Sequence, residues 1–321
     1  MQWLLLPLAG LFLLGAFLRR LAYRLRLLPV HRLPVPVIVV GNITLGGTGK
    51  TPLTLWLAQR LRAAGWRPGI VSRGYGGRQR GPAAVTPASD PYEVGDEPLL
   101  LARRSGLPVY IARRRVEAAR ALLAAHPHTD VLIADDGLQH YALARDVEIA
   151  VVDGQRRFGN GWPLPAGPLR ELPGRLRRVD AIVLHGGEDM GWLRTDRPVH
   201  RMRLVPQRLR ALDATGREQP LSWLSGRQVH AVAGIGHPAR FFELLRALGA
   251  AVEPHPFPDH HRFRPQDLPS GTVVMTEKDA VKCAAFARAD DWVLEVDAAV
   301  DPALINDVLH RIENRHGPET A

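Results

Sequence analysis

The sequence predicts an α/β fold in which helices cover both faces of a parallel sheet, with a second, smaller α/β unit and an N-terminal membrane helix. Three observations predict it. Short apolar runs rich in β-formers alternate with helical stretches over residues 37–184, and the alternation resumes after residue 228. A run of sixteen uncharged residues, 3–18, opens the chain. Strands that alternate with helices pair in parallel, and the connecting helices then cover the sheet.

The first predicted element is the apolar helix over residues 3–18. Four arginines follow it directly: Arg19, Arg20, Arg24 and Arg26. A signal peptide would carry its basic residues before the apolar run, and a core helix would show a polar face. The run is shorter than the roughly 20 residues that cross a bilayer, so a short span and a helix embedded in one leaflet both fit. We expect residues 1–26 to form a membrane anchor with a basic stem, and basic flanks stay in the cytoplasm.

The next elements form a first α/β unit, residues 27–187, and a second, residues 221–321. In the first unit, apolar runs predict strands and amphipathic stretches predict helices. The strands lie at 37–40, 69–72, 109–111, 131–134, 149–152 and 181–184, and the helices include 53–64 and 113–125. Residues 188–220 are short polar, Arg-rich segments that predict a linker with a small hairpin. The second unit has predicted strands at 229–233, 272–275 and 292–296, and helices at 239–248, 279–288 and 302–313.

The composition limits the possible functions. The chain has 42 basic and 32 acidic residues, a net charge of +10, but only three lysines: Lys50, Lys278 and Lys282. A single cysteine, Cys283, excludes a disulfide framework and a Cys-rich zinc site. Positive charge favours an anionic partner, either nucleic acid, an acidic membrane surface or a phosphorylated substrate. Aromatic residues make up only 6%, and nucleic-acid-binding motifs are missing from the sequence, so we expect no nucleic-acid partner.

A phosphate-binding loop is the strongest motif. Between a predicted strand and a predicted helix, the sequence fits G-x-x-x-x-G-K-[ST], with a threonine in place of the first glycine. Backbone N–H groups of such a loop surround phosphates, the lysine reaches the β- and γ-oxygens, and the last hydroxyl can hold Mg²⁺. We therefore predict ATP binding by Thr44, Leu45, Gly46, Gly47, Thr48, Gly49, Lys50 and Thr51.

Acidic residues at two further places are candidates for chemistry. Asp135 and Asp136 end the predicted strand 131–134, where carboxylates face the same crevice as the phosphate loop or merely cap the next turn. Asp96 and Glu97 open a helical stretch, where acids complement a helix N-terminus. Asp96 is alternatively a proton acceptor for an attacking hydroxyl, as a positioned aspartate is in kinases.

Two basic groups complete the list of candidates. His260 and His261 follow Asp259 in a predicted loop of the second unit. Adjacent histidines suggest zinc, but no third ligand with metal spacing stands nearby, and solvated histidines or an imidazole that orients a catalytic aspartate are the alternatives. Arg170 is a candidate phosphate clamp by its charge geometry.

Together these segments resemble the tetraacyldisaccharide 4′-kinase family, the lipid A 4′-kinases of Gram-negative bacteria. The resemblance covers nearly the whole chain in order, and two of its segments, DDGLQH and GNGWPLPAGPLRE, are far more specific than a phosphate loop. It is carried by VGNITLGGTGKTP (40–52), SRGYGG (72–77), VGDEP (94–98), ADDGLQH (134–140), VVDGQRRFGNGWPLPAGPLRE (151–171), FPDHHRF (257–263) and TEKDAVK (276–282).

The resemblance implies a role for most of the candidates. It implies a kinase that moves the γ-phosphate of ATP to the 4′-hydroxyl of an acylated glucosamine disaccharide 1-phosphate, with Mg²⁺. Asp96 would accept the proton and His260 would be its partner. Nucleotide and metal contacts would come from Lys50, Thr51, Asp135 and Asp136, with supporting roles for Glu97 beside the metal, Gln139, His140 and Arg170. Lys278 and Lys282 stay unassigned.

The expected setting is the cytoplasmic side of a bacterial inner membrane, with a lipid substrate and no obligate protein partner. Two other functions compete. A membrane-recruited P-loop switch ATPase typically carries an extra lysine early in the loop, where this chain has Leu45. A soluble small-molecule kinase would need residues 3–18 to be a core helix, which their uninterrupted apolar face disfavours.

Overall fold

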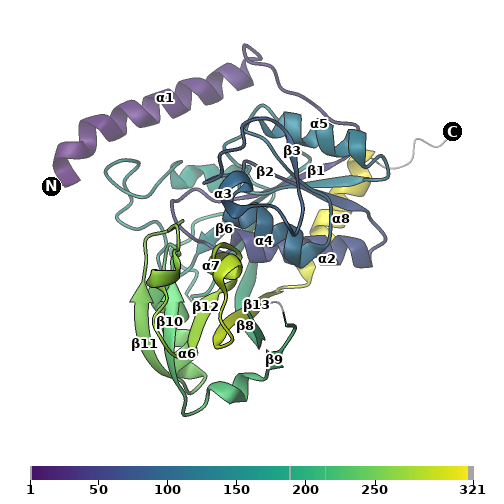
Figure 1. The fold of residues 1–321 in the computed structure, drawn as a ribbon. Helices are drawn as coiled ribbons and strands as arrows, with labels where there is room; N and C mark the ends of the chain where they lie inside the picture. Colours follow the sequence, from purple (N-terminus) through teal and green to yellow (C-terminus); the bar gives the residue numbers. More distant parts are fainter. Residues whose placement is uncertain (1, 188, 214, 317–321) are drawn as a thin grey trace.

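The computed structural model describes residues 2–187, 189–213 and 215–316, and within them one mixed sheet runs through both α/β units (Figure 1). The strand order is β11-β10-β12-β13-β8-β7-β6-β1-β5-β2-β4-β3, and β9 pairs with β8. Most neighbours are parallel, while the pairs β13/β8, β3/β4 and β8/β9 are antiparallel. The α/β class predicted from the alternation is therefore confirmed, with a mixed sheet in place of a purely parallel one.

The strands are β1 (Val37–Gly41), β2 (Pro68–Ser72), β3 (Ala83–Val85), β4 (Val109–Ile111), β5 (Val131–Ala134), β6 (Val147–Asp153), β7 (Ala181–His185), β8 (Val199–Ala211), β9 (Glu218–Gln219), β10 (Gln228–Ala233), β11 (Ala251–Pro256), β12 (Val273–Thr276) and β13 (Asp291–Val300). The helices are α1 (Leu6–Arg24), α2 (Lys50–Ala63), α3 (Pro91–Val94), α4 (Asp96–Ser105), α5 (Arg115–Ala125), α6 (Pro238–Ala247), α7 (Glu277–Cys283) and α8 (Ala303–His316). Each strand predicted in the first and second units lies within three residues of an observed one at its start.

The first unit is built around β1, which is buried along its whole length. Its neighbours β5 and β6 pair with it in parallel, so their carboxyl ends reach the same edge of the sheet. One face is covered by α2 and α4, and the other by α5, each through apolar residues that belong to separate core clusters. Burial on both faces explains why these strands read as continuous apolar runs in the sequence.

The segment 188–220, predicted as a linker, contains a strand that connects the two units. β8 pairs in parallel with β7 at its start and antiparallel with β13 from Met202 to Ala211. The predicted small hairpin is present as β8 and β9. β8 was missed because Arg201, Arg203 and Arg208 interrupt its apolar residues, so no apolar run marks it. The description of this segment as a linker alone is corrected accordingly.

The last two helices of the chain differ from the prediction, α7 in its length and α8 in the unit that it packs against. The strands β10, β12 and β13 and helix α6 occupy the predicted places, whereas α7 stops at Cys283 and continues as a 3-10 turn, Ala284–Phe286. Helix α8 was assigned to this unit, but its Leu304, Val308 and Ile312 join the core cluster of the first unit. The chain thus returns to the first unit after crossing the sheet, as Figure 1 shows.

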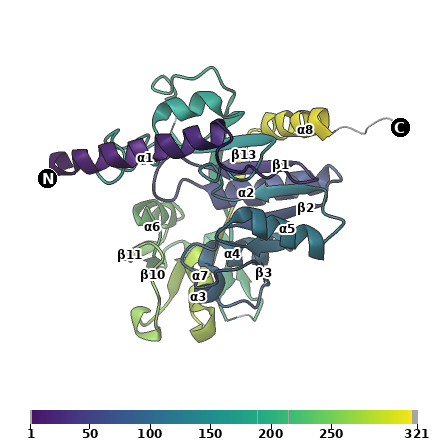
Figure 2. The same ribbon diagram turned by 90° about the horizontal axis from the view of Figure 1, so that it is seen from above.

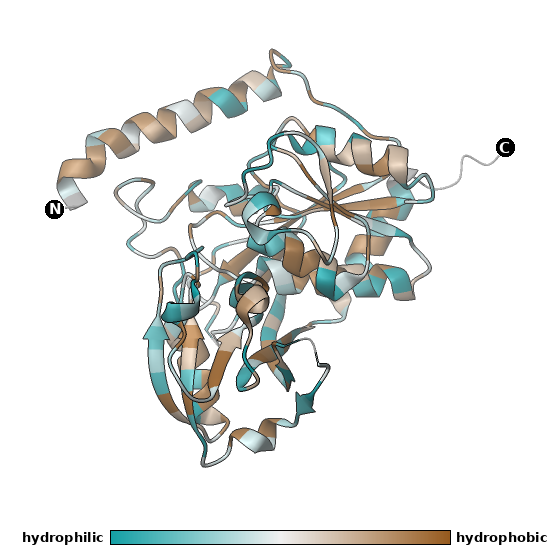
Figure 3. Cartoon of the chain, in the orientation of Figure 1, coloured by the Kyte–Doolittle hydropathy of each residue, from teal (hydrophilic) through white to brown (hydrophobic). Residues whose placement is uncertain are grey.

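Helix α1 lies on the outside of the molecule (Figures 1 and 2). Residues Trp3–Arg24 are long and apolar enough to cross a membrane, with a mean hydropathy of 1.8 and only 6% of the most apolar stretch buried. Figure 3 shows that most of this helix has hydrophobic colours, and Leu8, Leu11 and Phe17 are among its exposed residues. Because the helix leaves so much apolar surface exposed, its position is consistent with membrane association and does not fit a core helix.

Candidate active site

The phosphate loop follows β1 and leads directly into α2. Gly46 and Gly49 have φ angles of 95° and 94°, which side chains with a Cβ rarely adopt. A Cβ on Gly49 would also lie 2.8 Å from the methyl carbon of Met202. The glycines are therefore required by backbone conformation and by close packing. The loop leads into the first turn of α2, and loops of this kind bind an anion at the N-terminus of the helix that follows them.

Side chains outside the motif hold the loop in place. Asn42 Nδ2 donates a 3.1 Å hydrogen bond to Thr48 Oγ1, and both residues are fully or almost fully buried. Gln139 Nε2 donates to the backbone carbonyl of Asn42 at 2.9 Å. Gln139, predicted as a supporting residue, therefore stabilises the start of the loop through the backbone of Asn42. Leu45 is 40% exposed, and its N–H donates to the carbonyl of Pro168.

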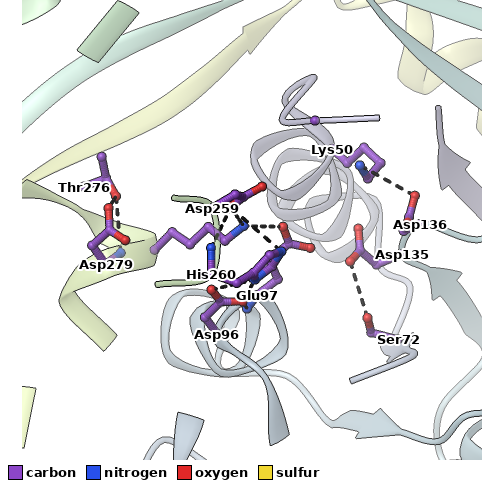
Figure 4. Close-up of polar contacts among 12 residues, drawn as sticks. Lys50, Ser72, Asp96, Glu97, Asp135, Asp136, Asp259, His260, Thr276 and Asp279 are labelled. Atoms are coloured by element: carbon purple, nitrogen blue, oxygen red, sulfur yellow. Dashed lines mark hydrogen bonds and ion pairs between the residues drawn. The ribbon is translucent and has the colours of Figure 1, made fainter. Parts of the chain in front are cut away.

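Asp136 is held between two cations at the carboxyl end of β5. Its carboxylate lies 3.6 Å from Lys50 Nζ and accepts two 3.0 Å hydrogen bonds from Arg170 Nη1. Burial raises the pKa of Asp136, but the charges of Lys50 and Arg170 outweigh it and hold that pKa well below the ordinary value. The residue has a φ of 47°, an uncommon conformation for a side chain with a Cβ. The structure thus brings together three of the predicted residues, of which Figure 4 shows Lys50 and Asp136.

Asp135, the preceding residue, is completely buried. Its carboxylate accepts hydrogen bonds from Thr54 Oγ1 at 3.4 Å and from Ser72 Oγ at 3.5 Å. Burial, with the nearby negative charges of Glu97 and Asp136, raises the pKa of Asp135 to about 7. Three carboxylates are therefore close enough to repel one another.

This repulsion tests whether the predicted magnesium ligands fit the ion. Mg²⁺ prefers hard oxygen ligands, usually one or two carboxylates together with phosphate and water. The predicted set offers one hydroxyl and three carboxylates: Thr51, Glu97, Asp135 and Asp136. A divalent cation among them would relieve the like-charge repulsion that raises the pKa of Asp135. The donor set fits a magnesium ion.

A carboxylate and an imidazole from different units meet at the start of α4. His260 Nδ1 lies 3.0 and 3.1 Å from the two carboxylate oxygens of Asp96, although 164 residues separate them. Burial raises the pKa of Asp96, but the hydrogen bond from His260 and the charge of Lys278 make the net shift downward. Burial lowers the pKa of His260, and the hydrogen bond with Asp96 more than reverses it. The two shifts have opposite signs, because each member of the pair stabilises the charged form of the other.

Neighbouring groups hold the two members of this pair. The Asp96 carboxylate accepts a 2.9 Å hydrogen bond from the N–H of Glu97 in the first turn of α4. The ring of Tyr75 packs edge-on against His260 with centroids 5.0 Å apart, and Tyr75 is 64% exposed. His261 does not join the pair, because its Nε2 lies 3.2 Å from Asp267. The contact with Asp96 is therefore made by His260, the histidine that the family resemblance names.

Two lysines that sequence analysis left unassigned lie beside this pair. Lys278 Nζ contacts Glu97 at 3.0 Å and Asp259 at 2.9 Å, so it connects the first turn of α4 to the loop before His260. Lys282 Nζ lies 2.8 Å from Asp279 and 3.7 Å from Asp96. The available signal was the scarcity of lysine: all three lysines of the chain face carboxylates of this site.

A cavity of about 400 Å³ lies between the two units and is lined by the phosphate loop. Its size is typical of small-molecule sites. Both units contribute walls: Gly47–Pro52, Glu97, His185, Arg203, Ile235–His237, Arg240, Phe241 and Lys278 are among the lining residues. A Cβ on Gly236 would approach the Gly47 nitrogen to 2.8 Å, so a loop of the second unit sits directly on the phosphate loop. Arg240, Phe241 and Gly236 carried no sequence motif and were missed.

His140, predicted as a supporting residue, lies apart from the cavity lining. Burial, with the charges of Arg115 and Arg145, lowers the pKa of His140 to about 3. The imidazole is therefore neutral at physiological pH. It follows that His140 contributes no positive charge to the binding of an anion.

The arrangement defines a class of protein. A phosphate loop precedes α2, and acidic residues follow the adjacent strand β5. A carboxylate–imidazole pair lies across the interface between the units. These features together are typical of a P-loop phosphotransferase. Comparison with known proteins then gives the family. The family model described as tetraacyldisaccharide-1-P 4′-kinase matches residues 1–313. The chain belongs to this family of kinases of lipid A biosynthesis.

Individual relatives agree with this assignment over more than nine tenths of their lengths. The chain is 52% identical over 316 residues to the tetraacyldisaccharide 4′-kinase of Methylobacillus flagellatus, which covers 97% of this chain and 92% of the relative. It is 54% identical over 323 residues to that of Aromatoleum aromaticum, with 99% and 95% covered. Its fold is similar to the crystal structure of the "apo" form of LpxK from Aquifex aeolicus in complex with ATP, with a TM-score of 0.81, 30% identity and 97% and 99% covered. The family and fold predicted from the motifs are confirmed.

Proposed function

We propose that this kinase transfers the γ-phosphate of ATP to the 4′-hydroxyl of an acylated glucosamine disaccharide 1-phosphate, with Asp96 as the proton acceptor. The observation that carries this proposal is the hydrogen-bonded pair of Asp96 and His260, formed between the two units next to Glu97, which lines the same cavity as the phosphate loop. A proton acceptor must be ionised at the working pH, and the downward shift of the Asp96 pKa meets that requirement.

Residues of the first unit hold the nucleotide in this proposal. The backbone N–H groups of the phosphate loop and the ammonium of Lys50 neutralise the β- and γ-phosphates. Arg170 lies next to Lys50 through their shared partner Asp136, so it adds a second cation where charge develops during transfer. ATP as the donor is supported by the Aquifex aeolicus relative, whose crystal structure is described as a complex with ATP.

Thr51, Glu97, Asp135 and Asp136 would hold the magnesium ion that accompanies the nucleotide. Such an ion neutralises phosphate charge and orients the phosphoryl oxygens when bound. Asp135 would have to be ionised to act as a ligand. Its hydrogen bonds from Thr54 and Ser72 then favour the charged form that burial disfavours.

The proposed chemical step is an in-line displacement. The oxygen of the 4′-hydroxyl forms a bond to the γ-phosphorus, the bond from that phosphorus to the bridging oxygen breaks, and ADP leaves with the electron pair. The hydroxyl proton passes to the Asp96 carboxylate. His260 keeps the carboxylate oriented through its hydrogen bond, and the same contact raises the pKa of the imidazole and so favours its charged form. Lys278 holds Glu97 and the loop before His260 at the same place.

The N-terminal helix would bring this site to its lipid substrate. Leu8, Leu11, Leu14 and Phe17 are among its exposed apolar side chains. Basic residues follow on the same helix and its extension, and clusters of basic residues near an apolar helix favour anionic membrane surfaces. We propose that the chain lies at the cytoplasmic face of the bacterial inner membrane.

An assay with labelled ATP tests the proposed reaction. Purified full-length chain in detergent receives labelled ATP and Mg²⁺ together with the acylated disaccharide 1-phosphate, a water-soluble sugar, or no acceptor. We expect label to move only to the lipid. ATP hydrolysis without acceptor at the same rate would favour a switch ATPase, and equal transfer to the soluble sugar would favour a soluble small-molecule kinase.

A flotation experiment tests the anchor separately. Replacing Leu11 and Leu14 by glutamate places charges on the apolar surface of α1, where both side chains are more than half exposed. We expect the wild-type chain to float with liposomes that contain anionic lipid and the variant to stay in the soluble fraction. Equal flotation of both proteins would contradict anchoring by this helix and leave the proposed chemistry untouched.

A further inference from the structure

A group of three potential metal ligands lies on the far edge of the sheet, outside the active site. His230 belongs to β10, and Glu253 and His255 belong to the edge strand β11 (Figure 1). The two strands are parallel, with His230 opposite Glu253 in the register. Residues two apart on a strand share a face, so His255 lies on the same side as Glu253. The strand pairing itself therefore gathers the three side chains.

The distances between the ligand atoms match those around a single metal ion. His230 Nδ1 lies 3.1 Å from His255 Nε2 and 3.3 Å from Glu253 Oε2, and His255 Nε2 lies 3.6 Å from Glu253 Oε1. Zinc binds imidazole nitrogen and carboxylate oxygen at about 2.0–2.2 Å in tetrahedral geometry, which places neighbouring ligand atoms about 3.3–3.5 Å apart. The three distances lie close to this value, and the two to Glu253 run to different oxygens of its carboxylate. The side chains thus already enclose a space of the right size.

We propose that His230, Glu253 and His255 bind one Zn²⁺ ion, with solvent as the fourth ligand. Two imidazole nitrogens and one carboxylate are ligands that zinc accepts and that Mg²⁺ does not favour. The side chains are partly exposed, 20% for His230, 27% for His255 and 51% for Glu253, which leaves access for the ion and for water. Zinc is distinct from the magnesium that accompanies the nucleotide, and it takes no part in phosphate transfer.

The surroundings of His230 select the nitrogen that would bind. A Cβ built on Gly271 would lie 3.6 Å from both Cδ2 and Nε2 of His230, so this edge of the ring faces the backbone turn. Nδ1 is left facing Glu253 and His255. Gly271 has a φ of 96°, where a residue with a Cβ would be strained, so this close approach is built into the turn.

The proposed ion would fasten the edge strand to the rest of the second unit. β11 contains Pro254 and Pro256, which donate no ladder hydrogen bonds, and four of its six residues are exposed. Four residues after this strand stands His260 of the active site. A zinc ion that holds β11 to β10 would stabilise the segment from which the His260 loop leaves the sheet.

A competing explanation needs no metal: one imidazole donates a proton to the other, and Glu253 compensates the charge. Both explanations account for short distances. They differ in what happens when zinc is added, because only a metal site binds one equivalent of the ion tightly and loses it when a nitrogen ligand is removed.

Zinc titration of the full-length, tag-free chain in detergent distinguishes them. The chain is first treated with a chelator and dialysed, then titrated with Zn²⁺ against a competing zinc indicator. We expect one ion per chain, with affinity at least 100-fold weaker in His255→Gln and at least 10-fold weaker in Glu253→Gln. The matched control His128→Gln removes an exposed histidine of the first unit, and we expect it to bind zinc as the wild type does.

Two further measurements make the result decisive. Zinc should raise the thermal unfolding temperature of the wild type and of His128→Gln but not that of His255→Gln, since a ligand that binds only the folded state stabilises it. Co²⁺ should give the intense visible absorption of a four-coordinate site in the wild type and in His128→Gln but not in His255→Gln. The proposal is overturned if no equivalent of zinc binds, or if His255→Gln and Glu253→Gln, folded by the same thermal assay, bind zinc unchanged.

Discussion

The two sides of the active site are built in different ways. The phosphate side is local: Lys50 belongs to the loop after β1, and its partner Asp136 ends β5, the next strand in the sheet. The acceptor side is assembled from distant segments, since Asp96 opens α4 in the first unit and His260 lies in a loop of the second. One side depends on a loop and a sheet, and the other on how two units pack together.

This difference has a mechanical consequence. The phosphate side keeps its geometry as long as the first unit is folded, because parallel strands fix the ends from which its residues project. The acceptor side exists only while the units are in contact, through Asp96 with His260 and Lys278 with Glu97. Arg104 adds a third connection by contacting both Glu277 and Asp297. Substitutions on the two sides should therefore fail in different ways.

The largest effect is expected on the acceptor side. Asp96→Asn removes the proton acceptor but keeps the shape, so turnover should fall by about 10³-fold, within the range for general base catalysis. ATP affinity should stay within about twofold, because the phosphate side is intact. Turnover is measured with the lipid acceptor, and affinity by equilibrium binding of labelled ATP. The control Asp196→Asn changes a side chain that is 78% exposed, and it should retain full activity.

Retention of turnover in Asp96→Asn would remove this residue as the base. Asp136 would not be a ready substitute, because its carboxylate is already bound by Arg170 and close to Lys50. A loss of ATP affinity equal to the loss of turnover would instead show that the two sides do not separate as the comparison requires.

The next largest effect is expected on the phosphate side. Lys50→Met removes the ammonium that would contact the phosphates, and a charge-assisted hydrogen bond contributes roughly 1.5–3 kcal/mol. ATP affinity should therefore fall by about 10²-fold, the reverse of the pattern for Asp96→Asn. Isothermal titration with ATP and Mg²⁺ measures it. Arg80→Met, which removes an exposed cation, should bind ATP normally; unchanged affinity in Lys50→Met would mean that the loop does not hold the phosphates through this lysine.

A smaller effect on turnover is expected from His260, and it tests whether this residue acts through Asp96. His260→Gln removes a residue that acts through Asp96, so we expect turnover to fall by about 10–100-fold, less than for Asp96→Asn. Adding His260→Gln to Asp96→Asn should cost almost nothing further, since residues that act as a unit are not additive. The measurement is the turnover of both single variants and the double variant. Fully additive losses would mean that His260 acts on the substrate independently of Asp96.

The same contrast explains what the sequence could predict. The strand β1, the phosphate loop and α2 are contiguous, so their residue types and spacing predict both structure and site. The pairing of Asp96 with His260 came from family resemblance, since nothing in the local sequence of either residue specifies its partner. Lysine is rare in this chain, which singled out Lys278, but its contact with Glu97 became known only from the packing of α7 against α4. The sequence did not predict β8, because its burial depends on neighbours 17 or more residues away on both sides.

Helix α8 was predicted from the sequence, but the core that it joins was not. Its amphipathic pattern predicts the helix correctly, but a pattern of apolar residues does not say which core they join. Val308 and Ile312 pack with the core of the first unit because β13 leads the chain back past β8. The sequence therefore assigns α8 to the second unit, which precedes it in the chain, although the helix packs against the first unit.

The smallest expected effect concerns the stability that the Asp96–His260 ion pair adds. The pKa of Asp96 is lowered from 3.8, so its contribution is present above that pH and is lost as the pH falls. The pKa of His260 is raised from 6.5, so its contribution is complete below that value and is lost as the pH rises through the folded-state pKa. The unfolding temperature of the wild type should therefore exceed that of His260→Gln most clearly between about pH 4 and 6.5, by about 2 °C, and the difference should shrink at higher pH. Thermal unfolding from pH 4 to 9 measures it, with His128→Gln as the matched histidine control. A difference that is constant over this range would mean that packing rather than charge joins the two units at this point.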